Sequence, residues 1–104
     1  MNVIWAEQAS KAVKQTVNYI AAEHGRKKME EFMQKVNAVG DLLGDNPYLG
    51  PTEPLLTNKP IAYRSVVVAK KNKIVYRIND DRIEVVDFWD VRREPKALAK
   101  QVKE

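Results

Sequence analysis

Basic side chains that could meet a phosphate or a carboxylate lie in the second half of the sequence. Residues 87–95 read DFWDVRREP, so the pair Arg92 and Arg93 follows two aromatic residues and is interleaved with acids. A guanidinium presents a planar fork of donors that matches phosphate and carboxylate oxygens. Asp87 and Asp90 stand where they could orient these arginines for a ligand. The same acids could equally make the arginines structural salt-bridge partners at the solvated end of a strand, and both interpretations remain open.

Three strand segments are predicted to form the sheet that positions these groups. Residues 62–69 (AYRSVVVA), 72–78 (NKIVYRI) and 82–89 (RIEVVDFW) are rich in β-branched and aromatic residues. The links between them, KK and NDD, are short enough for hairpins. A meander of three consecutive antiparallel strands is therefore predicted.

Alternation along these strands predicts a basic surface on one face of the sheet, because successive side chains point to opposite faces. In the middle strand the apolar set that runs from Ile74 to Ile78 is the better core. Arg64 is expected on the opposite face, since a charged guanidinium would not stay beneath helices without a partner. Tyr63 and Tyr76 are expected to face away from this basic surface. The predicted open face carries Arg64, Val66, Val68, Lys73, Val75 and Arg77.

This mixture of valines and cations favours a surface that a partner covers, since a plain solvated face would be polar throughout. A sheet with a few surface valines and an interface between two copies of the chain are the alternatives. Phe88 and Trp89 are neighbours, so one is expected in the helix-side core and the other beneath the terminal helix or a partner. The predicted partner-binding residues are Arg64, Val66, Val68, Lys73, Val75, Arg77, Trp89, Arg92 and Arg93.

The remaining elements are expected to cover the other face. Residues 2–5 (NVIW) are β-prone, and apolar residues then recur at helical spacing from about Glu7 until Gly25, a natural helix end. A second helical stripe runs from Met29 to Leu43, so the two helices should form an antiparallel hairpin. The loop at 44–54 follows, with its Tyr-Leu pair expected to tuck back onto the core, and a short helix is expected after Pro95.

The fold class predicted from this order is α+β. It comprises an N-terminal strand, an antiparallel helical hairpin packed on one face of a mainly antiparallel sheet, and a short C-terminal helix. The length of 104 residues with 44% hydrophobic content suits one domain over residues 1–104.

Composition excludes several classes of function. The chain has no cysteine, which rules out disulfides, thiolate zinc sites and a cysteine nucleophile, and fits a reducing cytoplasm. No apolar run approaches the roughly 20 residues of a membrane span, and no signal peptide pattern is visible. No cofactor or metal is expected, and His24, the single histidine, is expected to be an exposed turn residue. Residues 1–59 balance their charges, so the formal net charge of +4 belongs to residues 60–104 and weakly favours polyanions or an acidic protein partner.

The ordered set of these segments resembles the RelE/ParE superfamily of bacterial toxins from type II toxin–antitoxin systems. The segments that carry the resemblance are VIWAEQASKAVKQTVNYIAAEHGRKKMEEF, LLGDNPYLGPTEPL, YRSVVVAKKNKIVYRI and IEVVDFWDVRREP. The ParE-like branch, which includes plasmid stabilisation proteins, is the most similar. The resemblance implies a cognate antitoxin that wraps over the toxin, with self-association possible when the antitoxin is absent.

The resemblance implies one of two activities. RelE-like members cut mRNA in the ribosomal A site, whereas ParE-like members inhibit DNA gyrase, so the branch decides whether the chain is an enzyme. If it is a ribonuclease, Arg64, Lys73 and Arg92 match the family's basic residues. However, Val66 stands where RelE-like enzymes have a lysine, and Leu98 stands near the position of their C-terminal tyrosine. Gyrase inhibition is therefore the leading hypothesis, with ribosome-dependent mRNA cleavage and a pure protein-interaction module as alternatives.

Overall fold

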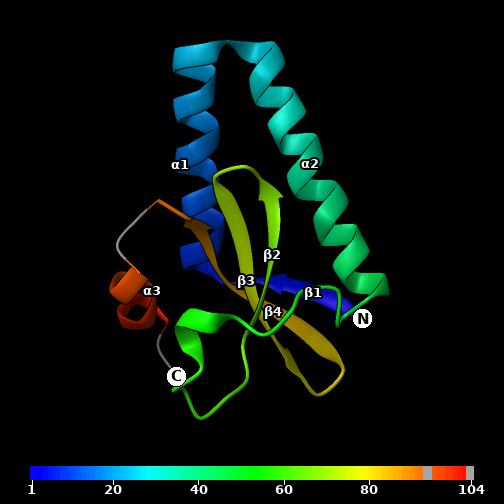
Figure 1. Ribbon diagram of the computed structural model, residues 1–104. Coiled ribbons are helices and arrows are strands. Elements are labelled where there is room, and N and C mark those ends of the chain that lie inside the picture. The colour runs from blue at the N-terminus through cyan, green and yellow to red at the C-terminus, as the bar shows by residue number, and fades with distance from the viewer. Residues whose placement is uncertain (93–94, 103–104) are drawn as a thin grey trace.

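The computed structural model describes residues 1–92 and 95–102, and its elements follow the predicted order (Figure 1). These elements are β1 (Asn2–Trp5), α1 (Glu7–His24), α2 (Arg26–Asp45), the 3-10 helix η1 (Pro54–Leu56), β2 (Arg64–Ala69), β3 (Asn72–Asn79), β4 (Arg82–Asp90) and α3 (Pro95–Gln101).

The strands form one four-stranded sheet in the order β1-β4-β3-β2. The three C-terminal strands make the predicted antiparallel meander. The N-terminal strand pairs in parallel with β4, from Asn2 opposite Arg82 to Trp5 opposite Val85. The prediction of an α+β fold with a mainly antiparallel sheet is confirmed.

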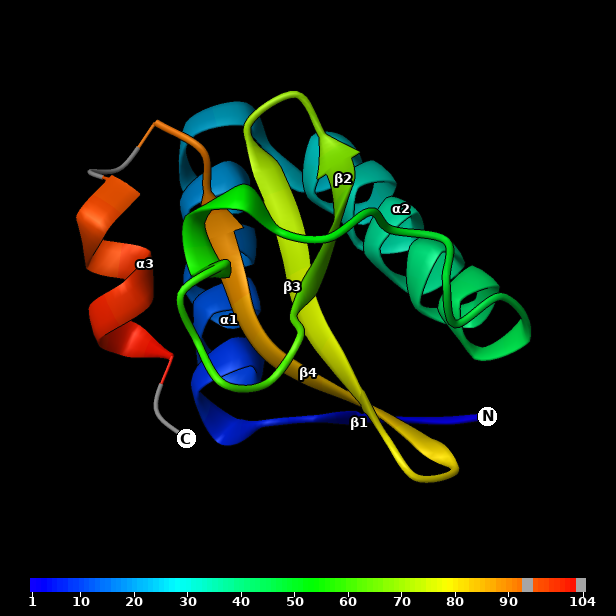
Figure 2. The same ribbon diagram turned by 60° about the horizontal axis from the view of Figure 1, so that its bottom comes forward.

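The helical hairpin turns at Gly25, whose φ of +87° lies in the region that only glycine enters without strain. The Gly25 N–H donates to the carbonyl of Ala21, which closes α1, and its own carbonyl accepts from Met29 in the first turn of α2. One residue therefore ends one helix and begins the next. Figure 2 shows the hairpin behind the sheet, with η1 and its flanking loop in front.

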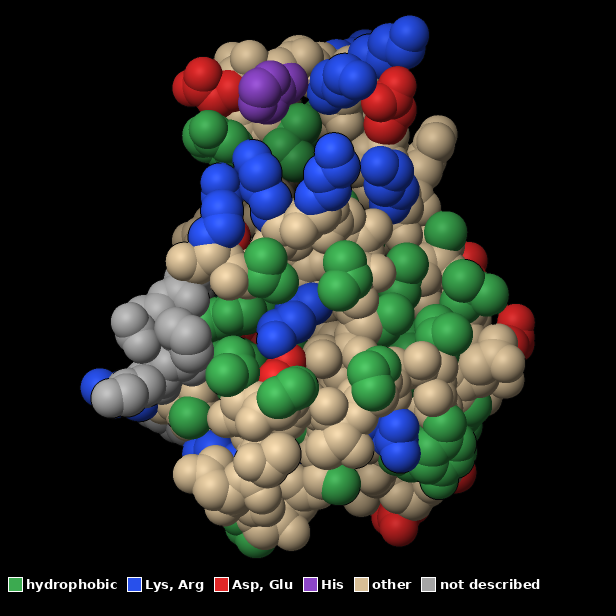
Figure 3. Space-filling model, viewed as in Figure 1, with side chains coloured by type: hydrophobic (Ala, Val, Ile, Leu, Met, Phe, Trp, Pro, Cys, Tyr) green, Lys and Arg blue, Asp and Glu red, His purple; other side chains and the backbone are tan. Residues whose placement is uncertain are grey.

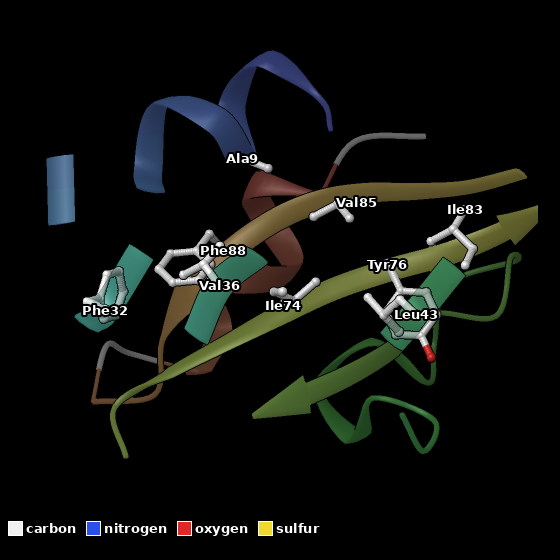
Figure 4. Packing of buried hydrophobic residues seen from close by; sticks show 9 residues of the cluster. All are labelled: Ala9, Phe32, Val36, Leu43, Ile74, Tyr76, Ile83, Val85 and Phe88. Carbon is white, nitrogen blue, oxygen red and sulfur yellow. The ribbon is translucent and has the colours of Figure 1, made fainter. Parts of the chain in front are cut away.

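The helix-side core fills the space between the hairpin and the sheet (Figure 4). The rings of Phe32 on α2 and Phe88 on β4 meet edge to face, with centroids 6.0 Å apart. The buried members of this cluster are Ala9, Phe32, Val36, Leu43, Ile74, Tyr76, Ile83, Val85 and Phe88.

The opposite face of the sheet carries a second, smaller core. Trp89 is 1% exposed and packs in a cluster with Leu98 and Val102 from the C-terminal end of the chain. Its other buried members are Leu56, Tyr63 and Val75. Phe88 and Trp89 thus face opposite sides of the sheet as predicted, with Trp89 on the side of the terminal helix. This face is covered by η1 and α3, so the prediction that it lies open is wrong.

A bulge in β4 explains how residues three apart come to share a face. Val75 pairs with Asp87 while the next residue, Tyr76, pairs with Val85, so Val86 has no partner across the ladder. Strict alternation would place Val85 and Phe88 on opposite faces, yet both belong to the helix-side core. The bulge therefore sets the direction of every side chain from Asp87 to the end of the strand.

Candidate functional site

Arg64 does not share a face with Lys73, contrary to the alternation argument. It pairs across the ladder with Tyr76, and Val66 and Val68 on the same side of β2 pack against the helix-side core. The orientation predicted for Arg64, Val66 and Val68 is therefore wrong. The reason is that Arg64 begins an edge strand, where its side chain reaches past the core to partners in a loop.

Those partners belong to the loop that follows α2. The Arg64 guanidinium lies 4.8 Å from the centre of the Tyr48 ring, and its Nη1 donates to the carbonyl of Gly50 at 2.8 Å. Tyr48 is 69% exposed and Leu49 is exposed too, so the expectation that both tuck into the core is wrong. Instead, the Arg64 guanidinium covers one side of the Tyr48 ring, and these contacts connect β2 to the loop.

The phenol of Tyr76 is hydrogen-bonded to the same loop. Its hydroxyl accepts from the Gly50 N–H at 2.9 Å and donates to the Pro47 carbonyl at 2.8 Å. Burial raises the pKa of Tyr76, against the opposing effects of the Gly50 N–H and the Arg64 charge. A side chain so placed is a structural fastening of the loop and is not available as an acid or base in solution.

Lys73 lies on the second face as predicted, but its charge is already paired. Its Nζ donates to the carboxylate of Glu53, which is 0% exposed, while Lys73 itself is 14% exposed. Burial alone would raise the pKa of Glu53. The Leu55 N–H at 2.7 Å and the ammonium of Lys73 outweigh burial and hold that pKa below its ordinary value. Alternation and charge patterning do not reveal Glu53, because an acid in a loop rich in proline ordinarily faces water.

Arg77 also faces this side and is also paired. Its Nε donates to Glu84 on the neighbouring strand at 2.6 Å, and Arg82 approaches the same carboxylate at 3.1 Å. The hydrogen bond from Arg77 is the main cause that lowers the pKa of Glu84. The predicted basic face is thus largely neutralised within the chain.

The apolar residues predicted for partner binding are mostly covered. Val75 is fully buried and Trp89 nearly so, hence neither contributes to the surface of the described structure. Val67 is the exposed valine of β2, at 63%. In the run SVVVA both sets of alternate residues contain valine and neither contains a charge, so the sequence does not reveal which valine points outward.

Arg92 lies on the surface just after β4 and forms an ion pair with Asp90. Its Nε and Nη2 donate to the two oxygens of Asp90 at 3.0 and 2.7 Å, and its backbone N–H donates to the same group. The hydrogen bond from Arg92 lowers the pKa of Asp90. Arg92 is 63% exposed, and a guanidinium has five donors, so donors remain for a ligand. Arg93, predicted beside it, lies outside the described residues.

The positions that match a RelE-like catalytic set do not converge on one site. Arg64 lies on the helix side of the sheet, Lys73 lies on the other, and Arg92 lies exposed beyond the end of β4. Leu98, near the position of the family's tyrosine, is fully buried. Tyr63 was expected to face away from Lys73, but it belongs to the cluster on the Lys73 side and is 2% exposed. His24 is exposed at the end of α1, as expected.

Across residues 1–92 and 95–102, no three His, Cys, Asp or Glu side chains gather as a metal site. Within the same ranges, every helix is too short or too polar to cross a membrane.

Comparison with known proteins identifies the kind of chain that has this fold. The family model for the ParE toxin of the type II toxin–antitoxin system parDE matches residues 3–95. No curated protein sequence matches the chain. Among solved structures, the chromosomal ParDE system from P. aeruginosa is similar at a TM-score of 0.72 and 15% identity, covering 88% of this chain and 96% of that one.

Two other solved structures share the fold. The YoeB/ParE toxin from Agrobacterium tumefaciens has a TM-score of 0.59 at 19% identity, over 86% of this chain and 98% of that one. A chain of the E. coli DinJ-YafQ complex has a TM-score of 0.57 at 20% identity, over 86% and 91%. At these identities the likeness concerns the fold alone.

Proposed function

The chain belongs to the ParE toxin family of type II toxin–antitoxin systems, and on that premise we propose that it inhibits DNA gyrase or a related essential target. In this proposal the protein acts in the cytoplasm and needs no catalytic residues. A cognate antitoxin holds it inactive until the antitoxin is lost.

The observation that carries the proposal is the separation of the residues that mRNA cleavage would need. Attack by a ribose 2′-hydroxyl requires a base, an acid and stabilisation of the developing charge in one place. Here Arg64 is bound to the loop carbonyl of Gly50, and Lys73 is committed to buried Glu53. A toxin that works by binding requires none of this convergence, so the arrangement supports the gyrase branch.

The antitoxin proposal rests on charge and on the related complexes. Chains of this fold occur in the E. coli DinJ-YafQ and Staphylococcus aureus YoeB-YefM structures, both of which are toxin–antitoxin complexes. An acid-bearing antitoxin segment would complement the net charge of +4 of this chain. Of the residues predicted to bind a partner, Arg92 stays in the proposed surface because it is exposed and retains donors. Without the antitoxin, the chain could self-associate.

Induced expression of the chain, with and without a candidate antitoxin encoded by a neighbouring reading frame, tests the whole proposal. Growth arrest relieved by that frame is expected. Purified protein should block supercoiling by gyrase and leave mRNA uncut on programmed ribosomes. Cleavage of mRNA in the A site with unaffected supercoiling would overturn the proposed target. If the protein affected neither supercoiling nor mRNA, only protein interaction would remain as the function.

Arg92 separates binding from catalysis quantitatively. If the protein is a gyrase inhibitor, Arg92→Ala should weaken inhibition by about tenfold or less, because it removes one contact among several. If the protein cleaves mRNA, loss of a group that stabilises the transition state should cost about 10²–10³-fold in rate. Arg26→Ala is the matched control, since Arg26 is an exposed arginine that pairs with Glu30 at 2.8 Å on the hairpin tip.

A further inference from the structure

A recess lies between the tip of the helical hairpin and the turn that joins β2 and β3. It has a volume of about 610 Å³ and receives side chains from α1, α2, this turn, the last residue of β4 and Arg92 just beyond it. The name basic recess is used for its polar rim, formed by Tyr19, His24, Lys35, Lys70, Lys71 and Arg92. Figure 3 shows a band of Lys and Arg side chains crossing the molecule below the hairpin tip, with the single histidine above it.

The cations of this recess are less neutralised than those of the predicted basic face. Within the part of the chain that the structure describes, no ion pair involves Lys35, Lys70 or Lys71, and all three are exposed. Asp90 is the acid of the lining: its carboxylate accepts both of its side-chain hydrogen bonds from Arg92, and the charge of Lys71 acts on it more weakly. Like charges gathered around one hollow repel each other unless an anion enters, so the recess favours an anionic ligand.

An aromatic ring stands at the mouth of the same recess. Tyr19 is 63% exposed, and the edge of its ring meets His24 with centroids 6.4 Å apart. Arg92 lines the same recess, and its hydrogen bond to Asp90 is the main cause that raises the pKa of its guanidinium. Phe32 lines the recess as well and is nearly buried. Proteins that bind single-stranded nucleic acids combine an exposed aromatic ring, on which a base stacks, with cations that pair with the phosphates.

We propose that the basic recess binds single-stranded nucleic acid, with Lys35, Lys70 and Lys71 along the phosphates and a base stacked on Tyr19. A volume of about 610 Å³ is in the range of pockets for ligands of drug-like size, so it suits one or two nucleotides and not a double helix. An acidic peptide would use the lysines but has no need of the exposed ring. The recess lies apart from the Lys73–Glu53 pair but shares Arg92 with the proposed partner surface, so the variants that test it leave Arg92 unchanged.

The test measures binding of the full chain to fluorescein-labelled 12-nucleotide single strands of DNA and of RNA by fluorescence anisotropy across a salt series. Lys70→Glu with Lys71→Glu should weaken binding at least tenfold at low salt and reduce the slope of log K against log salt by about 1.4, for two phosphate contacts. The matched control is Lys11→Glu with Lys14→Glu, which makes the same charge change at two exposed lysines of α1 that do not line the recess.

Tyr19 supplies the second arm of the test. Tyr19→Ala should weaken binding about five- to 150-fold, whereas Tyr19→Phe keeps the ring and should bind like the parent chain. Equal losses in the recess variant and its lysine control would overturn the proposal, because binding would then follow net charge alone. The proposal would also be overturned if the chain bound an unlabelled poly-aspartate peptide and bound neither oligonucleotide. That result would assign the recess to an acidic protein.

Discussion

The ammonium of Lys73 is bound to the carboxylate of Glu53, and that carboxylate is fully removed from solvent. This pair joins β3 to the segment that leads into η1 and closes the second face of the sheet. The sequence suggested that Lys73 could bind the anion of a partner. In the structure its charge is instead paired with Glu53 of the same chain.

Loss of Lys73 is expected to destabilise the fold strongly. Lys73→Met leaves the Glu53 carboxylate buried without its countercharge, which should lower the free energy of unfolding by about 3–5 kcal/mol. Adding Glu53→Gln should recover much of that loss, since the uncompensated charge is then gone. Urea unfolding of the parent, both single variants and the double variant gives the coupling energy. A Lys73→Met chain as stable as the parent would show that the pair contributes nothing.

The depressed pKa of Glu53 predicts a dependence of stability on pH. A group whose pKa is lower in the folded state contributes stability above its unfolded pKa, which is about 4.3 for glutamate, and loses it as the pH falls through the folded value. The free energy of unfolding should therefore fall between about pH 5 and pH 3. Glu84 and Asp90 act in the same direction, so the informative quantity is the difference between the parent and Glu53→Gln. A difference that stays constant across this range would contradict the prediction.

Removing one hydroxyl should loosen the loop after α2. Tyr76→Phe deprives the buried Gly50 N–H of its acceptor and the Pro47 carbonyl of a donor, at an expected cost of about 1–3 kcal/mol. Urea unfolding measures the loss, and faster hydrogen exchange at the Gly50 amide would locate it. Tyr19→Phe is the control, because the Tyr19 side chain is exposed and its change should stay within about 0.5 kcal/mol.

Two glycines should respond in opposite directions to the same substitution. A Cβ on Gly50 would lie 2.3 Å from the carbonyl oxygen of Ser65, so Gly50→Ala must push two backbone segments apart and should cost about 1–3 kcal/mol. Gly40 lies inside α2 with open space around it, and Gly40→Ala should stabilise the protein by about 0.5–1 kcal/mol. Thermal unfolding of the two variants measures both effects. Equal shifts of the two melting temperatures would contradict the packing argument.

Hydrophobic periodicity predicted the order and type of the elements well, because each one is patterned over enough residues to be distinctive. Alternation then failed within β2, where one charged residue was used to orient a run of valines. Arg64 escapes the helix-side core through the end of an edge strand, and that route depends on where Tyr48 and Gly50 lie in space.

Predicting the site requires still more information that is absent from any local sequence pattern. The bulge at Val86 changes which residues of β4 share a face, and a bulge of this kind leaves no mark in composition. The burial of Glu53 follows from the path of a loop. The basic recess brings Lys35 beside Lys70 only when the hairpin folds back over the sheet, so the charge count could indicate an excess of cations but not where they meet.

The parallel pairing of β1 with β4 bears on when the protein can complete its fold during synthesis. Asn2 has its ladder partner at Arg82, so residues of the first strand leave the ribosome long before the strand that must lie beside them. Closing so long a segment carries an entropic cost that only the finished sheet offsets. Until β4 has emerged, the apolar segment at 2–5 has no strand to pair with, although it can already contact α2. A polypeptide released early by interrupted translation would lack the middle of its sheet, and a toxin of this topology is expected to become active only when nearly all of it has been made.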